Sequence, residues 1–96
     1  MKGINISELI ELLSHGHEAE FTYRNTPYVI QPEIKDGQAF LVIWNCLPDG
    51  KCIAQHNIPE QGDIPVSAIE YVLNYKCFSG KSFMEIESEI TVDVIF

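Results

Sequence analysis

The run AFLVIW, Ala39–Trp44, constrains this chain more than any other feature, because every one of its residues is apolar. A membrane-spanning helix needs about 20 apolar residues, so the run is far too short to cross a bilayer. Successive side chains of a β-strand point to opposite faces, so a strand with this sequence is apolar on both faces. We therefore predict a central strand, with one face against helices and the other partly covered.

The flanking segments alternate with the two-residue period of strands. In AEFTY the residues Ala19, Phe21 and Tyr23 point one way, which predicts a first strand. A turn at 25–27 leads to a second strand, YVIQ, and a connection from 31 to 38 leads to the apolar run. KCIAQHNI predicts a fourth strand antiparallel to the third, and EITVDVIF predicts a C-terminal strand.

The first helix is predicted by an apolar stripe with the spacing of a helix face. The stripe consists of Ile6, Leu9, Ile10 and Leu13. Asn5 is a good N-cap, and Glu8 follows three residues later, as in a capping box. A second helix is predicted within PVSAIEYVLNY, where a proline is tolerated in the first turn.

The triplet Gly80-Lys81-Ser82 raises the question of a nucleotide site. A phosphate-binding loop needs a second glycine five residues earlier, after a strand, but Tyr75 stands there and a helix precedes it. We instead predict that Gly80 turns the chain and that Ser82 caps a short third helix, with Glu85 completing a capping box.

These elements follow one another in the order α-β-β-β-β-α-α-β. Residues 1–96 contain no linker long enough to divide them, which predicts a single α+β domain. Its sheet is mainly antiparallel, with about five strands, and two to three helices cover one face. An edge strand, either the second or the C-terminal one, offers a route to a homodimer.

The charge balance is strongly acidic. The chain has 14 Asp and Glu against 6 Lys and Arg, a net charge of -8. Such a surface repels phosphates, so we expect neither direct nucleic-acid binding nor binding to an anionic membrane. The same field attracts a basic protein partner. The acids expected to meet it are Glu8, Glu11, Glu18, Glu20, Glu85, Glu87 and Glu89.

Zinc binding is an alternative, through the set Cys46, Cys52, His56 and Cys77. In a regular strand Cys52 and His56 share a face, with Cys46 across the turn. The spacings are not those of a finger or ribbon, and free cysteines are commonly small core residues. The pattern therefore predicts no metal and no other cofactor.

Catalysis would need an activated nucleophile. Cys46 or Cys52 with His56 are the arguable pairs, but the sequence supplies no orienting third group and no oxyanion loop. We expect no enzyme activity. The odd number of cysteines excludes a simple disulfide framework, and no signal peptide opens the chain, so we expect a cytoplasmic protein.

Four aromatic residues fall on successive predicted strands, namely Tyr23, Tyr28, Phe40 and Trp44. Stacked on one sheet face they could read bases, but basic residues are missing between them, so we assign them to the core. A subset left at the surface beside acids would suit a protein partner, because Tyr and Trp are enriched in interfaces.

Two segments, ISELIELLSHGHEAEFTYRNTPYVI and CFSGKSFMEIESEITVDVI, carry a resemblance. In the first an acidic amphipathic helix enters a hairpin, and in the second a Gly-Lys-Ser turn enters a helix and a strand. Together, over less than half of the chain, they resemble a family of small uncharacterised proteins from Gram-positive bacteria and their mobile elements. The resemblance implies a fold and carries no active site.

These observations lead to a functional hypothesis. We expect a non-catalytic protein-binding or regulatory module, and more specifically a phage or mobile-element inhibitor of a basic nucleic-acid enzyme. An anti-CRISPR or immunity-type protein would occupy the phosphate-binding groove of a nuclease. A small zinc-binding module and a purely structural domain are the alternatives.

Overall fold

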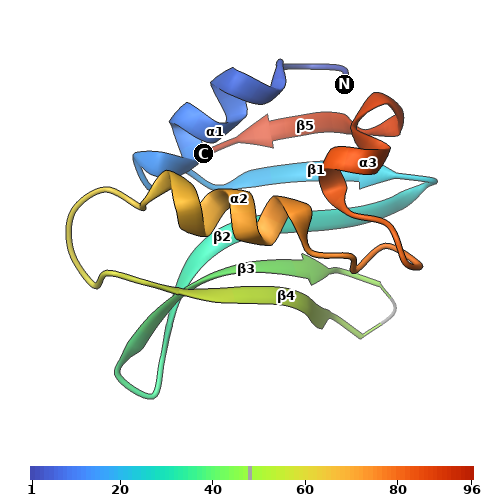
Figure 1. Cartoon of the computed structure of the whole chain (residues 1–96). Helices are drawn as coiled ribbons and strands as arrows, with labels where there is room; N and C mark the ends of the chain where they lie inside the picture. The colour runs from blue at the N-terminus through green and yellow to red at the C-terminus, as the bar shows by residue number, and fades with distance from the viewer. Residues whose placement is uncertain (48) are drawn as a thin grey trace.

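A five-stranded sheet forms one layer of the molecule, and helices pack on one of its faces (Figure 1). The computed structural model describes residues 1–47 and 49–96. The strands are β1 (Ala19–Tyr23), β2 (Thr26–Lys35), β3 (Gln38–Asn45), β4 (Lys51–Ile58) and β5 (Thr91–Ile95). Their order across the sheet is β4-β3-β2-β1-β5, and every neighbouring pair is antiparallel.

The helices are α1 (Ile6–Ser14), α2 (Val66–Asn74) and α3 (Phe83–Ile86), and a 3₁₀ turn, η1 (Glu87–Glu89), continues α3. These elements confirm the predicted α+β class and the order α-β-β-β-β-α-α-β. Both predicted caps are present. The Asn5 side chain accepts from the Glu8 backbone N–H at 2.9 Å, and Ser82 with Glu85 forms a reciprocal capping box.

The core lies between the helices and the face of the sheet that they cover. Phe21 of β1 is its centre, because it stacks on Tyr28 with ring centroids 5.3 Å apart and meets Phe83 edge-on at 5.1 Å. Phe78 closes the cluster against Tyr28 at 5.2 Å. The alternation predicted for β1 is confirmed, since Ala19, Phe21 and Tyr23 are all buried.

The turns correct two predicted boundaries. The first hairpin turns at Arg24-Asn25, both with positive φ, so the expected turn at 25–27 is one residue too late. β2 also does not end at Gln31, because it continues through Pro32 and pairs in register with β3 as far as Lys35. Positive φ at Asp36 and Gly37 then makes the tight turn, as Asp-Gly hairpins require.

The sheet order also revises which strands are edges. β3 is an interior strand as predicted, but β2 occupies the middle, so the prediction that the second strand is an edge is wrong. The reason is topological. Strands β1 to β4 form a meander, and β5 returns to pair with β1, which leaves β4 and β5 at the edges.

The Gly-Lys-Ser triplet forms part of a turn that reverses the chain. Ser79 and Gly80 both have positive φ, and the Phe78 N–H donates to the Lys81 carbonyl at 2.8 Å. Ser82 then caps α3 and is buried. The backbone around the triplet is therefore a two-residue turn followed by a helix cap.

Candidate functional site

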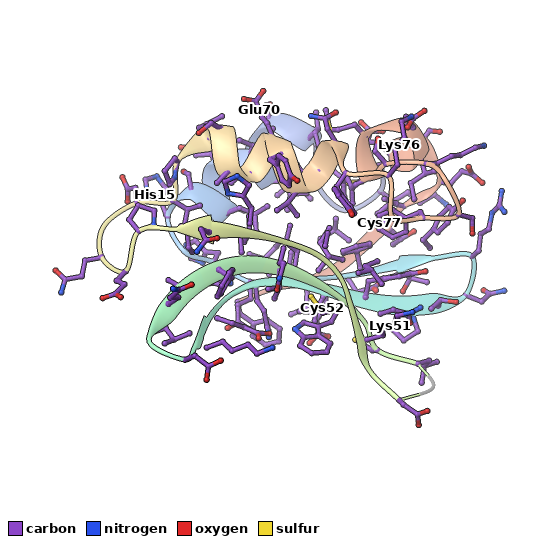
Figure 2. The ribbon with its side chains drawn as sticks, turned by 60° about the horizontal axis from the view of Figure 1, so that its bottom comes forward. His15, Lys51, Cys52, Glu70, Lys76 and Cys77 are labelled. Atoms are coloured by element: carbon purple, nitrogen blue, oxygen red, sulfur yellow. The ribbon has the colours of Figure 1, made fainter. Side chains whose placement is uncertain are left out.

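The face of the sheet that no helix covers is the candidate site, and we call it the open face. Figure 2 shows the helices on one side of the sheet and side chains projecting from the other. The register assigns its members, because paired residues share a face: Trp44 pairs with Val29 and Cys52, Val42 pairs with Gln31 and Gln55, and Phe40 pairs with Glu33. Glu20, Thr22 and Asp93 extend the open face over β1 and β5.

An apolar strip runs along β3 on the open face. It consists of Phe40, Val42 and Trp44. Val42 is 3% exposed although no helix lies over it, so its neighbours on the sheet shield it. Phe40 and Trp44 are half-buried, which leaves part of each ring accessible.

One carboxylate holds the tryptophan. The Trp44 indole N–H donates to Glu33 Oε2, and Gln31 Nε2 donates to the same oxygen at 2.8 Å. A charged acceptor strengthens both hydrogen bonds. The ring of Trp44 is therefore fixed in place on the open face while part of it faces solvent.

Beside the strip lies an acidic hollow of about 430 Å³ at the β1–β5 side of the sheet. Its acidic members are Glu18, Glu20 and Asp93, and no Lys, Arg or His lines it among the described residues. Asp93 reaches this face because the β1–β5 register shifts between Glu20 and Phe21, and its Oδ2 accepts from the Thr22 hydroxyl at 2.7 Å. The hollow therefore concentrates negative charge.

The seven acids expected at a partner interface do not form one surface. Glu18 and Glu20 lie in the acidic hollow. Glu8 and Glu11 are exposed on α1, which packs on the other side of the sheet. Sequence reasoning did not select Glu33 and Asp93, although counting hairpin register from the Asp-Gly turn would have placed Glu33 opposite Phe40 on the outer face.

The acids of the α3 end are each paired with a cation of the same chain. Lys76 Nζ lies 2.8 Å from Glu85, the Met1 amino group 3.2 Å from Glu87, and Arg24 3.7 Å from Glu89. Hydrogen bonds from Lys76 and from the Ser82 N–H lower the pKa of Glu85. Each of these carboxylates therefore already has a counter-charge within the chain.

The expectation that Cys52 and His56 share a face is wrong, because β4 contains a bulge. Ile43 pairs with Ala54 but Trp44 pairs with Cys52, so one extra residue reverses the alternation. Cys52 lies on the open face, whereas His56 pairs with Leu41 and its ring lies 4.5 Å from Tyr71 of α2.

The other two members of the proposed zinc set lie elsewhere. Cys77 packs against the core from the helix side, and Cys46 is exposed after β3 (Figure 2 labels Cys52 and Cys77). Among the described residues, no group of three His, Cys, Asp or Glu is placed to hold a metal ion.

Cys52 and Cys77 are not activated as nucleophiles by their surroundings. Burial raises the pKa of Cys52, whose Sγ donates to the Ala54 carbonyl at 3.5 Å. Burial raises the pKa of Cys77 to about 11. A raised pKa lowers the thiolate fraction at neutral pH, and the thiolate is the reactive form.

The four aromatic residues divide between the two faces. Tyr23 and Tyr28 are buried in the core, as expected. Phe40 and Trp44 lie on the open face beside Glu33, which is the surface subset next to acids that the sequence left as an alternative.

Comparison of the chain with models of protein families, with curated protein sequences and with solved structures finds no match. None of the helices that the structure describes is both long and apolar enough to cross a membrane.

Proposed function

We propose that this protein is a non-catalytic protein-binding module whose open face docks on a basic partner. The observation that carries the proposal is the apolar strip of Phe40, Val42 and Trp44 lying beside the acidic hollow. Protein interfaces typically combine a partly buried aromatic anchor with charged surroundings. The open face offers both features on a rigid sheet.

The acids and the strip have different roles in this proposal. Glu20 and Asp93 are exposed, and no ion pair within the described residues uses them. They can steer a cationic surface toward the face and set its orientation. Trp44, already held by Glu33, loses little conformational freedom on binding, so its accessible area can contribute to affinity.

The partner that we infer is a nucleic-acid enzyme, most specifically a nuclease. Such enzymes present Lys and Arg where they hold phosphates, and an acidic face can occupy that groove. The protein would then act in the cytoplasm as a phage or mobile-element inhibitor of the anti-CRISPR or immunity type. No cofactor, nucleic acid or membrane has a part in this mechanism.

The test compares two matched double variants. Glu20→Gln/Asp93→Asn removes two acids from the open face, whereas Glu8→Gln/Glu11→Gln removes two from α1. Each protein is immobilised and exposed to host lysate at low and high salt, and basic nucleic-acid enzymes retained by the wild type are then purified for a direct binding and inhibition assay.

We expect the wild type and the α1 variant to bind the same enzyme, and the open-face variant to bind it about tenfold more weakly. High salt should weaken the wild-type complex, because screening reduces charge attraction. The proposal fails if the two variants lose binding equally, or if the wild type retains no basic protein.

A further inference from the structure

We propose a second interaction surface, at which the outer edge of β4 accepts an extended acidic segment of a partner protein as a sixth strand. Edge strands bind peptides in this way because their outward N–H and C=O groups are available for a new ladder. The proposal differs from that for the open face, since it concerns the rim of the sheet and a partner of opposite charge, although Cys52 and Gln55 belong to both surfaces.

The two edges of the sheet are not equivalent. At β5 the N-terminal segment fills the outer side: the Lys2 N–H donates to the Ile90 carbonyl at 3.0 Å, and the Val92 N–H donates to the Lys2 carbonyl at 2.9 Å. Gly3 lies so close that a Cβ there would stand 2.4 Å from the Val92 carbonyl oxygen. The start of that edge, as far as Val92, is therefore already covered.

The outer edge of β4 has no such cover within the described residues. None of the backbone hydrogen bonds outside the regular strands and helices involves residues 51–58. Figure 1 shows β4 as the outermost strand, with α2 above it. Within the described residues this edge therefore carries no backbone cover. Two of its carbonyls have side-chain contacts, Ala54 with Cys52 Sγ at 3.5 Å and Asn57 with His56 Nδ1 at 2.8 Å, which a partner strand would have to displace where they point outward.

A groove of about 430 Å³ follows this edge. Residues 52–55 of β4 line one side, and Tyr71 of α2 and Tyr75, the residue that follows α2, line the other. These tyrosines are 50% and 47% exposed, and their ring centroids lie 6.1 Å apart. An added strand would thus place alternate side chains against two aromatic rings, which is how such grooves select sequence.

The charge along the groove determines the kind of occupant. Lys35 lines it and Lys51 begins β4, and neither forms an ion pair among the described residues. Among the described residues no acid lines the groove, and the nearby Glu33 carboxylate accepts hydrogen bonds from Trp44 and Gln31. In a chain of net charge -8, this edge favours an acidic segment.

A second copy of this chain fits the edge less well. The strand KCIAQHNI contains no acid, so pairing two β4 strands would leave both copies of Lys51 without a counter-charge. The bulge at Ile53 also interrupts a straight ladder, and bulges are a known means of discouraging edge-to-edge pairing. A partner strand alongside 54–58 avoids the bulge, reaches the groove at residues 54 and 55, and can extend acidic residues toward Lys51.

The test uses three synthetic ten-residue peptides on the full-length protein labelled with ¹⁵N. The first alternates valine or threonine with glutamate, the second has lysine in place of glutamate, and the third is the acidic peptide N-methylated at alternate residues. Amide chemical shifts locate the binding site. The variants are Lys35→Gln/Lys51→Gln and, as a control that removes one positive charge at the opposite edge, Lys2→Gln.

We expect the acidic peptide to shift amides of β4, of the last turn of α2 with Tyr71, and of Tyr75 just after the helix. N-methylation should abolish this binding, because it removes the donors of the new ladder. The double lysine variant should bind about threefold more weakly, and Lys2→Gln should bind normally.

Three outcomes would overturn the proposal: equal binding of the N-methylated peptide, acidic-peptide shifts confined to other surfaces, or no shift at millimolar peptide. Self-association through β4 without peptide would also overturn it, by identifying a second copy as the occupant. Shifts caused by the lysine peptide around Glu20 and Asp93 report on the open face, so the two proposals succeed or fail independently.

Discussion

The two faces of β3 use the same kind of side chain differently. Leu41 and Ile43 point toward the helices and are both 0% exposed. Phe40 and Trp44 alternate with them and lie on the open face, where each remains half-buried. Large apolar side chains on a strand are therefore fully buried only where another layer covers their face, whereas the smaller Val42 is shielded by its neighbours on the sheet.

The acidic residues also differ between regions, in whether a cation of the same chain is paired with them. Glu85, Glu87 and Glu89 are the densest acidic group of the sequence, yet each has a cation partner within the chain. Glu20 and Asp93 are far apart in the sequence but line one hollow, with no cation among its described residues. The density of acidic residues along the sequence therefore does not reveal which carboxylates a partner can reach.

The largest effect should come from the covered face. Ile43→Ala leaves a cavity in the core between the sheet and the helices and should lower the free energy of unfolding by about 2–5 kcal/mol, measured by urea denaturation. Phe40→Ala, on the open face of the same strand, should cost clearly less because its ring is only half-buried. Equal losses would show that both faces of β3 belong to the core.

Partner binding should depend most on the open face, whereas stability depends most on the covered face. Trp44→Ala should weaken partner binding by about 2 kcal/mol, or roughly thirtyfold, as interface tryptophans commonly do. Trp44→Phe keeps most of the area but loses the donor to Glu33, so it should retain more affinity.

The chain has one tryptophan, so its emission reports directly on the open face. Docking there should change the emission of the wild-type protein. Unchanged emission on formation of a stable complex would exclude the open face as the interface.

The acidic group at the α3 end should affect stability more than binding. Glu85→Gln/Glu87→Gln/Glu89→Gln removes three ion pairs and weakens the α3 cap, so thermal unfolding should occur at a lower temperature. Partner affinity should fall less than in Glu20→Gln/Asp93→Asn. A larger fall would place docking at the α3 end, as the clustering of acids along the sequence predicts.

The lowered pKa of Glu85 also predicts how the stability of the folded protein depends on pH. A lowered folded-state pKa stabilises the protein above the ordinary value of 4.5, and that stabilisation is lost as the pH falls through the folded value. Thermal unfolding of the single variant Glu85→Gln should therefore depend less on pH in this acidic range than that of the wild type.

The smallest expected effect is a difference between cysteines in their rate of chemical labelling. Cys46 is exposed at the rim of the acidic hollow, whereas Cys77 packs against the core with its pKa raised to about 11. Iodoacetamide should label Cys46 first and Cys77 far more slowly at pH 8, as peptide mass spectrometry can show. Fast labelling of Cys77 would contradict its packing.

The Cys77 shift also has a consequence for stability in alkali. Its pKa is raised above the ordinary value of 9.0, so the folded state holds the proton more tightly. Its contribution is therefore complete below pH 9 and declines as the pH rises toward about 11. Cys77→Ala should flatten this part of the pH profile.

The sequence by itself determined the elements, their order and the caps. Asn5 with Glu8, and Ser82 with Glu85, interact within one turn of the chain, and the alternation in β1 expresses the period of a strand. Such features depend on neighbours a few residues away, so they can be predicted from the sequence alone.

Only the tertiary structure decided which surfaces are available. The bulge that separates Cys52 from His56 exists through pairing with β3, and Thr22 meets Asp93 only because β5 returns beside β1. Likewise Arg24 lies 3.7 Å from Glu89, and Lys2 pairs with the start of β5, across long stretches of sequence. These contacts depend on register and strand order, which no local pattern of residues specifies.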